Sequence, residues 1–278
     1  MPLARAKVNL WLNVVGRRAD GFHLLDSLVA FTDLADEIEV APAPALSLEV
    51  VGPAAAGLEG ESDNLMLKAA RLLAGRAGVA PRAALRLTKR IPVAAGLGGG
   101  SADAAATLLA LVDLWRVAMP EEELFDLAAT LGADVPMCLA GRPALVSGIG
   151  ERLAPAPALP PCALLLVNPG VALPTPAVFG ARQGGFSPAR APGNGWGSLG
   201  ELAADLAGRG NDLTDAAISL RPEVAEVLHR LRRSDGVAHV AMSGSGATCF
   251  GLYGSIGEAR RAESLLPASW WRHAGRLV

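Results

Sequence analysis

The chain has 278 residues, 51% of them hydrophobic, and its 25 basic and 27 acidic side chains give a net charge of −2. This length suits one large domain or two ordinary ones, with ample apolar surface for a buried core. With a balanced charge and no long basic run, the composition gives no reason to expect a nucleic-acid or membrane partner.

Short strands are expected at the start of the chain. Alternating apolar residues from Ala6 to Val15 predict a half-buried strand. The Asp20-Gly21 pair then suits a tight turn. Three further short strands are expected in HLLDSLVAF, DEIEVA and LSLEVV.

Two helices and a strand are expected next. The stretch DNLMLKAARLLAGRAG predicts a helix with Asp63 or Asn64 as its N-cap and Gly75 or Gly78 near its end. The strand AALRLTKRI leads into a glycine-rich stretch. Beyond that stretch, a helix begins at the acidic PEEE and ends at Gly132.

The second half starts after a proline-rich connector. The stretch ERLAPAPALPP is the best candidate boundary, so we expect domains over 1–155 and 156–278. A strand (CALLLVNPG) follows, and the glycine- and proline-rich residues 180–200 predict a mobile loop. The rest predicts a helix (PEVAEVLHRLRRS), a strand (GVAHVAM), a glycine turn (SGSGAT), a strand (CFGLYG) and a helix (GEARRAESLL). Both halves therefore indicate α+β domains with mainly antiparallel strands.

The cysteines and the N-terminus indicate a soluble, cytoplasmic protein. The three cysteines form no CxxC pair, which fits a reducing compartment without disulfides, and the histidines have no metal-ligand spacing. We therefore expect no protein metal site. The first residues lack the continuous apolar core of a signal peptide, and no apolar stretch is long enough for a membrane span.

The glycine-rich stretch PVAAGLGGGSADAAATLLAL packs four glycines into residues 96–100, before an expected helix over 101–115. It is neither a P-loop, which needs a following lysine, nor a Rossmann fingerprint, which needs a glycine where this chain has Ser101. Glycines before a helix let backbone N–H groups approach a phosphate, whose charge the helix dipole favours. A tight strand-to-helix turn is the plainer alternative. Four glycines plus Ser101, as helix cap or as phosphate or metal contact, favour a phosphate site.

Other polar residues have plain explanations when taken alone. Asp134, in TLGADVPMCL, could simply cap the turn that Pro136 begins. Lys7 and Asn9 share one face of the first strand, which could be solvated, and MSGSGATCF could be no more than a hairpin turn.

Together these stretches resemble a known family. PVAAGLGGGSADAA strongly resembles the central motif of the GHMP kinase superfamily. AKVNLWLNVVGRRADGFH, GADVP, NPGVALPTPAVF and SGSGATCF resemble one branch, whose substrate is a cytidine diphosphate-linked methylerythritol. The match runs in order from Arg5 to Phe250 and is weakest over residues 180–200.

The resemblance implies an ATP-dependent small-molecule kinase of two α+β domains, with the active site in the cleft between them. It would transfer the γ-phosphoryl group of ATP to the 2-hydroxyl of the erythritol unit, in the non-mevalonate route to isoprenoid precursors, with Mg²⁺ arriving on ATP. The expected partner is this small molecule, with no nucleic acid and no membrane. We expect a monomer or a weak homodimer.

By position, the resemblance also implies roles for individual residues. Asp134 matches the catalytic aspartate and Lys7 the lysine paired with it. Asn64 and Lys89 fall near the adenine and ribose side of the ATP pocket. The ATP phosphate loop comprises Pro92, Val93, Ala94, Ala95, Gly96, Leu97, Gly98, Gly99, Gly100, Ser101 and Ala102.

The residues expected around the substrate are Asn9, Phe22, His23, Thr175, Phe179 and Gly244. Asn9 matches a residue near the accepting hydroxyl. The Phe22 ring stacks on the cytosine, which His23 reads, and Phe179 stacks from the other side. The turn around Gly244 closes the floor under the phosphates. The family usually carries tyrosine where this chain has Phe22, so any role of a phenolic hydroxyl is lost.

Two alternatives stay open. Another GHMP kinase, of the homoserine or mevalonate type, would share the central motif, although DGFH and the early lysine argue against it. A non-catalytic nucleotide- or RNA-binding module would share the fold, but the chain lacks a basic patch and a binding module needs neither Lys7 nor Asp134.

Overall fold

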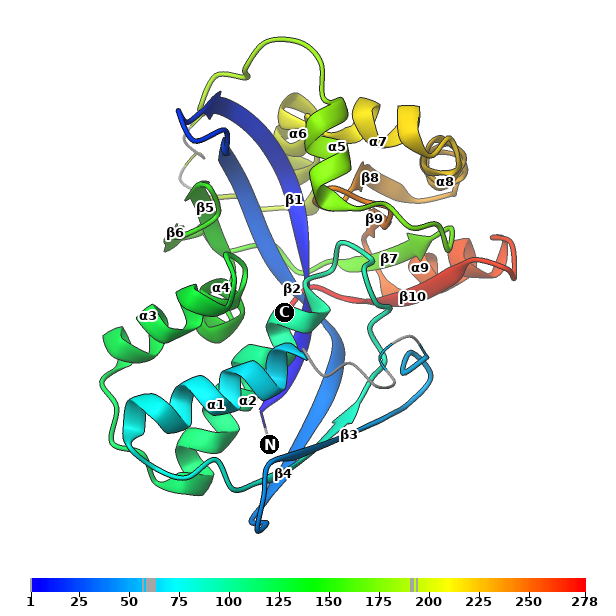
Figure 1. The fold of residues 1–278 in the computed structure, drawn as a ribbon. Helices are drawn as coiled ribbons and strands as arrows, with labels where there is room; N and C mark the ends of the chain where they lie inside the picture. The colour runs from blue at the N-terminus through cyan, green and yellow to red at the C-terminus, as the bar shows by residue number, and fades with distance from the viewer. Residues whose placement is uncertain (1, 57, 59–63, 191–192, 194) are drawn as a thin grey trace. The chain divides into compact units, whose positions relative to one another are not determined.

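The computed structural model describes residues 2–56, 58, 64–190, 193 and 195–278 (Figure 1). The chain forms two compact units, each built from several segments. Unit 1 comprises Met1–Lys7, Leu34–Val93 and Gly98–Arg142, and unit 2 comprises Val8–Asp33, Ala94–Leu97 and Pro143–Val278. These units do not follow a single cut of the chain, and the predicted domains over 1–155 and 156–278 stay a prediction.

Two long strands, β1 (Leu3–Arg17) and β2 (His23–Ala41), pair with each other. The strand predicted around Ala6–Val15 is confirmed, but residues 6–14 are all buried, so the prediction that it is only half-buried was wrong and the plain explanation of a solvated polar face fails. HLLDSLVAF and DEIEVA were predicted as two strands and form one. Residues 23–41 contain no glycine or proline that would end the strand.

Unit 1 holds a small sheet and four helices. The second half of β2 pairs antiparallel with β4 (Ala84–Thr88), and β4 pairs parallel with β3 (Ser47–Val51). The helices are α1 (Leu65–Ala77), α2 (Gly99–Trp115), α3 (Glu121–Leu131) and α4 (Val135–Ala140). Helix α1 packs on α2, and α4 packs on α2 and α3 (Figure 1). Their apolar faces and those of the strands form one core, in which Leu73, Leu85 and Leu108 are fully buried.

The ends of α1 follow local chemistry. The Asn64 side chain accepts a hydrogen bond from the Met66 N–H at 2.9 Å, and Gly78 ends the helix in the left-handed conformation with φ 66°. The Asn64 and Gly78 alternatives are thus confirmed. The other N-cap candidate, Asp63, lies outside the described residues.

The proline-rich connector contains a strand that the sequence did not reveal. The first half of β2 pairs antiparallel with β5 (Ala144–Gly148), and β5 pairs antiparallel with β6 (Arg152–Pro155) in unit 2. Strand β6 lies at the edge of the sheet. An edge strand tolerates proline because one side of it needs no ladder hydrogen bond, which explains how Pro155 is accommodated.

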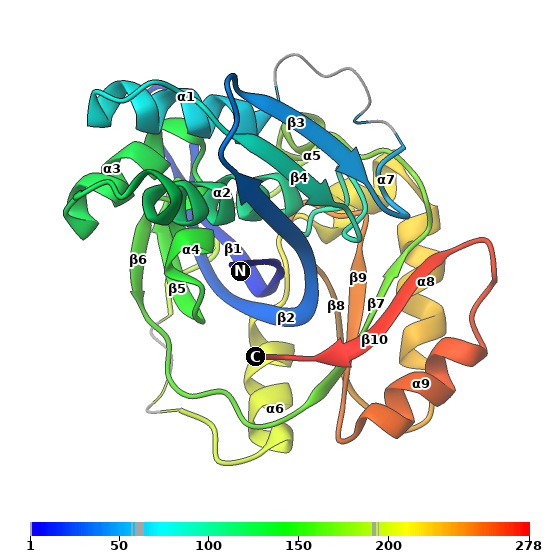
Figure 2. The same cartoon turned by 90° about the horizontal axis from the view of Figure 1, so that it is seen from below.

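Unit 2 also holds a four-stranded antiparallel sheet in the order β10-β7-β9-β8. Its strands are β7 (Ala163–Asn168), β8 (Val237–Met242), β9 (Cys249–Tyr253) and β10 (Trp271–Arg276). Helices α8 (Glu223–Arg232) and α9 (Ile256–Ser264) pack along it (Figure 2). The three strands, two helices and glycine turn expected here are confirmed, whereas β10 was missed because WRHAGR does not alternate in polarity.

The remaining helices of unit 2 are α5 (Thr175–Ala181), α6 (Leu199–Arg209) and α7 (Thr214–Leu220), none of them predicted. Between α5 and α6 the described residues are anchored by hydrogen bonds. The Ser187 N–H donates to the Val14 carbonyl at 2.9 Å, and the Arg190 N–H donates to Asp26 Oδ2 at 3.0 Å. This segment therefore follows strands β1 and β2, which a loop prediction from composition did not foresee.

Candidate active site

Lys7 and Asp134 form an ion pair in unit 1. Lys7 Nζ, on β1, lies 3.5 Å from Asp134 Oδ2, just before α4. The lysine side chain is 8% exposed and that of the aspartate 42%, so the carboxylate keeps an open side. Asp134 occupies the N-cap position of α4, but its side chain makes no capping hydrogen bond. The plain capping explanation is therefore wrong, and the carboxylate is available to a ligand.

The first half of the glycine-rich loop is fixed to the turn between β8 and β9 within unit 2. Thr248 Oγ1 donates to the Ala95 carbonyl at 2.6 Å, and Ser243 Oγ donates to the Gly96 carbonyl at 3.4 Å. A Cβ on Gly96 would lie 2.5 Å from the Gly246 carbonyl oxygen, and Gly96 has φ 76°. Gly96 is therefore required by backbone conformation and close packing.

The second half of the loop opens helix α2 in unit 1. Gly98 is the N-cap, with φ 68°, and a Cβ on it would lie 2.8 Å from Lys7 Cγ. A Cβ on Gly99 would lie 3.0 Å from Lys89 Nζ, whereas one on Gly100 would meet no atom of the described residues within 4 Å. Among the residues that the structure describes, Gly98 and Gly99 thus have neighbours that leave no room for a side chain, and Gly100 has none. An exposed glycine in the first turn of a helix is the arrangement that admits an anion.

Ser101 lies inside the first turn of α2 and is not its cap, so that part of its prediction was wrong. The prediction that it contacts a phosphate or its metal stays open.

Lys89 lies in a buried ion cluster. Its side chain is 2% exposed, and Nζ lies 2.6 Å from Asp36 Oδ2 and 2.5 Å from Asp103 Oδ2. Burial alone would lower the pKa of Lys89, but the charges of the two carboxylates and their hydrogen bonds raise it above its usual value. The ammonium is therefore charged and faces the protein interior. The expected place of Lys89 near the adenine and ribose side of the ATP pocket stays a prediction.

His23 and Phe179 come together in unit 2. Their rings stack with centroids 5.1 Å apart and an angle of 22° between the planes. Burial lowers the pKa of His23, and the positive charges of Arg17 and Arg182 lower it further, so the ring is neutral at pH 7. Phe22 is 58% exposed and does not join the stack. The structure thus assembles two of the three predicted base-contacting residues, and it shows that Phe22 is no core residue.

The remaining predicted substrate residues are fixed by hydrogen bonds within unit 2. The Asn9 amide donates to Ser27 Oγ at 2.9 Å from a buried position on β1. Thr175 Oγ1 lies 2.8 Å from Ser245 Oγ. The Gly244 carbonyl accepts a hydrogen bond from Asn211 Nδ2 at 2.9 Å. Thr175 and Gly244 therefore both belong to the surroundings of the β8–β9 turn.

Sequence reasoning missed Asp36 and Asp103. One signal could have found Asp103, an acidic residue within the apolar run ADAAATLLAL. A carboxylate in such a run requires a buried partner. Asp36 has no comparable signal, because the sequence DEIEV is typical of an ordinary strand with exposed acidic side chains.

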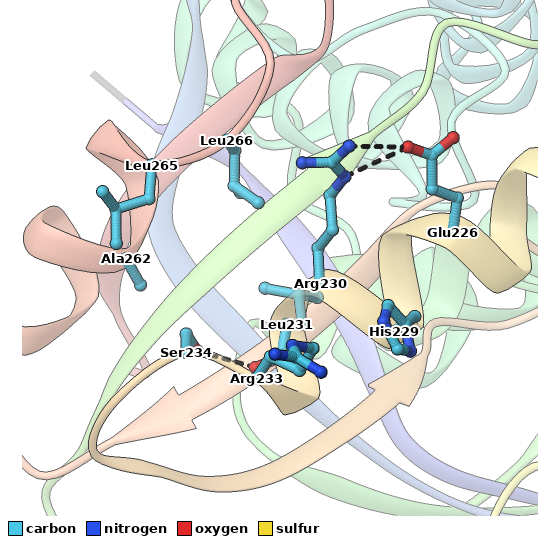
Figure 3. A pocket seen from close by; sticks show the side chains of 9 residues that line it. All are labelled: Glu226, His229, Arg230, Leu231, Arg233, Ser234, Ala262, Leu265 and Leu266. Carbon is cyan, nitrogen blue, oxygen red and sulfur yellow. Dashed lines mark hydrogen bonds and ion pairs between the residues drawn. The ribbon is translucent and has the colours of Figure 1, made fainter.

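A separate pocket of about 370 Å³ lies between α8 and α9 in unit 2 (Figure 3). Arg230 at its rim is paired with Glu226 at 2.9 Å, and Leu265 and Leu266 form its apolar side. None of the predicted site residues lines it, so it has no place in the chemistry proposed below.

The described residues contain neither a membrane-spanning helix nor a cluster of metal-binding side chains. No helix among them combines the length and apolar character needed to cross a membrane. They also contain no group of three or more histidine, cysteine, aspartate or glutamate side chains that could hold a metal ion.

Comparison with known proteins decides the family. The model for the GHMP kinases N terminal domain matches residues 64–142, and that for the GHMP kinases C terminal domain matches residues 182–270. The chain is 54% identical to the 4-diphosphocytidyl-2-C-methyl-D-erythritol kinase of Paramagnetospirillum magneticum, over 99% of this chain and 97% of that protein. It belongs to this family of GHMP kinases.

Two further comparisons agree. The enzyme of the same name from Rhodospirillum rubrum is 52% identical over 99% of this chain and 91% of that protein. A crystal structure of 4-(cytidine 5'-diphospho)-2C-methyl-D-erythritol kinase has a TM-score of 0.82 and 42% identity, covering 99% of this chain and 98% of that one. The chain thus has the GHMP kinase fold of mixed helices and mainly antiparallel sheets, and the ATP-dependent kinase activity of that family follows.

Proposed function

We propose that this protein transfers the γ-phosphoryl group of ATP to the 2-hydroxyl of 4-diphosphocytidyl-2-C-methyl-D-erythritol, which yields the 2-phosphate and ADP. The observation that carries the proposal is the Lys7–Asp134 pair, in which a half-open carboxylate lies 3.5 Å from a buried ammonium. Near-full-length identity of about one half to kinases of this name supports the choice of substrate.

The pair suits the acceptor side of the reaction. The acceptor is a tertiary alcohol whose proton must leave, and a carboxylate within hydrogen-bond reach can orient the hydroxyl and take the proton. Lys7 offsets the negative charge that grows on the alkoxide. Asn9, two residues along β1, is assigned to the same hydroxyl.

The open N-terminus of α2 suits the donor side. Phosphoryl transfer asks a protein mainly for positioning and charge stabilisation, which backbone N–H groups and the helix dipole supply. We assign the contact with the phosphates to the backbone of residues 98–101, where Gly100 leaves room for a ligand.

Mg²⁺ would be held mainly by ATP itself, because this ion keeps several water ligands and takes few from protein. The Ser101 hydroxyl, in the first turn of α2 and not used as its cap, is the candidate protein ligand. When bound, the ion neutralises charge on the β- and γ-phosphates.

His23 and Phe179 are assigned to the cytosine base. A neutral imidazole can both donate and accept a hydrogen bond, which suits the polar edge of a pyrimidine. Phe22, exposed on the turn after β1, offers a second aromatic surface. Asn64 remains the candidate for the adenine side, with its Oδ1 already committed to capping α1.

We assign the reaction to the cytoplasm, because that is where ATP is supplied. A monomer or a weak homodimer would suffice for the reaction.

The test is phosphoryl transfer from ATP with three acceptors: the cytidylyl substrate, homoserine and mevalonate. We expect turnover with the first alone. Turnover with homoserine or mevalonate would assign the chain to another GHMP kinase activity, and ATP binding without turnover of any acceptor would leave a non-catalytic nucleotide-binding module.

A further inference from the structure

Arg182 lies at the C-terminal end of helix α5, just beyond the turn that carries the stacked ring of Phe179. Its side chain is only 8% exposed. Arginine is mostly found at the surface of proteins, and a buried guanidinium group requires partners that offset the loss of water contacts. The partners of Arg182 therefore indicate what this side chain does.

The guanidinium group of Arg182 is held from three sides. Nη2 lies 3.9 Å from Asp212 Oδ2 and donates to the Gly185 carbonyl at 2.5 Å. Nη1 donates to the Gly184 carbonyl at 3.5 Å, and the central carbon of the group lies 5.7 Å from the centroid of the Phe186 ring. The planar fork of arginine suits several acceptors at fixed angles. Arg182 thus fixes the chain directly after α5 to Asp212.

Asp212 is in turn fixed to strand β1. Its Oδ2 accepts a hydrogen bond from the Val14 N–H at 2.7 Å, and its Oδ1 accepts one from the Asn13 side-chain amide at 3.3 Å. Strand β1 pairs with β2, which begins at His23. The contacts of this aspartate therefore tie the end of α5 to the pair of strands that carries His23.

Helix α5 depends on such contacts for its position. It has seven residues, all of them described by the structure, and of these only Val178 is buried. It packs on α7, but helices this short are marginal in water without further tertiary contacts. The backbone at Arg182 is already extended, with φ −62° and ψ 131°, so the helix stops there. The orientation of Phe179 therefore depends on what the end of α5 is attached to.

We propose that Arg182 is a positioning residue for cytidine recognition. Together with Asp212 it fixes the end of α5, so that the Phe179 ring stays stacked on His23 in the arrangement that receives the base. Arg182 acts through these two rings and has no part in the phosphoryl transfer. The inference rests on the proposed function, in which His23 and Phe179 bind the cytosine.

The charge of Arg182 acts on the same pair of rings. Burial lowers the pKa of His23 most, and the charges of Arg17 and Arg182 lower it further. A neutral imidazole keeps one nitrogen as a hydrogen-bond acceptor, which a protonated ring lacks. Arg182 thus supports base recognition both through the position of α5 and through the neutral state of His23.

The test is the affinity for cytidine, which carries the base without the group that is phosphorylated. In Arg182→Gln we expect Kd for cytidine, measured by calorimetry, to rise about three- to tenfold, less than the loss of a whole stacked ring would cause. KM for the cytidylyl substrate should rise by a similar factor, while kcat and KM for ATP change less than about twofold. A general loss of folded protein would instead lower kcat.

Arg221→Gln is the matched control. Arg221 is an exposed arginine of unit 2 that also donates to backbone carbonyls, those of Ala172 at 3.2 Å and Leu220 at 3.0 Å. This variant loses the same charge and should keep the wild-type Kd. Asp212→Asn removes the partner of Arg182 and should raise Kd as Arg182→Gln does. Because the two residues act as a pair, the double variant should show little further rise.

A wild-type Kd for cytidine in folded Arg182→Gln, or an equal rise in Arg221→Gln, would overturn the proposal. If Arg182→Gln does not fold, Arg182→Lys decides, because an ammonium group keeps the charge but cannot bind the carboxylate and both carbonyls as the fork does. Its Kd should exceed that of the wild type at least about twofold, and a wild-type value would contradict us. Absence of cytidine binding by the wild type would refute the proposed base site instead.

Discussion

Lys7 Nζ lies 3.5 Å from Asp134 Oδ2, and only the aspartate of this pair is substantially open to solvent. A buried cation beside an accessible carboxylate suits a proton acceptor, because a substrate hydroxyl can reach the carboxylate and the lysine offsets the negative charge that develops on that hydroxyl. Both residues belong to unit 1, so this geometry is set within one compact unit.

Asp134→Asn keeps the shape of the side chain and removes the base. We expect kcat to fall by about 10²–10⁴-fold, which is typical of lost general-base catalysis, with ATP binding little changed. Steady-state kinetics with the cytidylyl substrate measure the effect. The control is Asp126→Asn on α3, also exposed, which should leave kcat unchanged. Near-normal kcat in folded Asp134→Asn would remove Asp134 from the mechanism.

Lys7→Met should also lower kcat, because the charge that supports Asp134 is lost while the buried side chain keeps its length. The double variant with Asp134→Asn should cost less than the two single losses combined, since the residues act as a pair. A double-mutant cycle on kcat measures the coupling. Additive losses would show that the two residues work independently.

The local signals of the sequence were sufficient where structure is decided by neighbours along the chain. The Asn64 cap and the Gly78 end of α1 follow from hydrogen bonds within a few residues, so they could be predicted. The continuity of β2 could not, because its partners β4 and β5 are supplied much later in the chain. The same holds for the buried partners of Lys89, because the carboxylates of Asp36 and Asp103 come from other elements.

The glycine-rich loop was predictable where neighbours along the chain decide its structure, and it was not predictable where residues from other elements decide it. Its helix was predictable from the alanine and leucine pattern, but four glycines looked alike in the sequence. A Cβ on Gly96, Gly98 or Gly99 would lie close to protein atoms, and one on Gly100 would not, as far as the described residues extend. A valine at Gly99, for instance, would meet Lys89 and Ile91, so its effects on folding and on ATP binding could not be separated.

Gly100→Ala separates the two explanations of the loop. A Cβ here meets no atom of the part of the chain that the structure describes within 4 Å, and replacing a helical glycine with alanine stabilises a helix by up to about 1 kcal/mol. If the loop holds phosphate, the methyl group obstructs the ligand, and Kd for ATP should rise about tenfold or more although the melting temperature holds or increases. Calorimetry and thermal unfolding measure the two quantities.

Gly75→Ala provides the matched control for this experiment. Gly75 is an exposed helical glycine in α1, where a Cβ also meets none of the described atoms within 4 Å. It should show the same gain in stability with unchanged Kd for ATP. Equal Kd values in Gly100→Ala, Gly75→Ala and the wild type would mean that the loop is only a turn.

The pH dependence of cytidine recognition should follow His23. Because the pKa of His23 is lowered from its ordinary 6.5, the folded state favours the neutral ring. The stability that the neutral ring gives the folded protein is fully present above pH 6.5 and is lost as the pH falls below that value. KM for the cytidylyl substrate should therefore rise in acid, and this rise should vanish in His23→Gln. The same acid limb in both proteins would assign it to another group.

Phe22 is 58% exposed, so its role can be tested without damage to a core. An aromatic side chain stacked on a base contributes roughly 1–3 kcal/mol by alanine substitution. Phe22→Ala should accordingly raise KM for the cytidylyl substrate by about one to two orders of magnitude, while KM for ATP and the melting temperature stay close to those of the wild type. Phe22→Tyr restores the usual residue of the family and should keep KM low, because an exposed ring tolerates the added hydroxyl. A Phe22→Ala protein with wild-type KM would show that His23 and Phe179, whose rings already stack 5.1 Å apart, recognise the base without it.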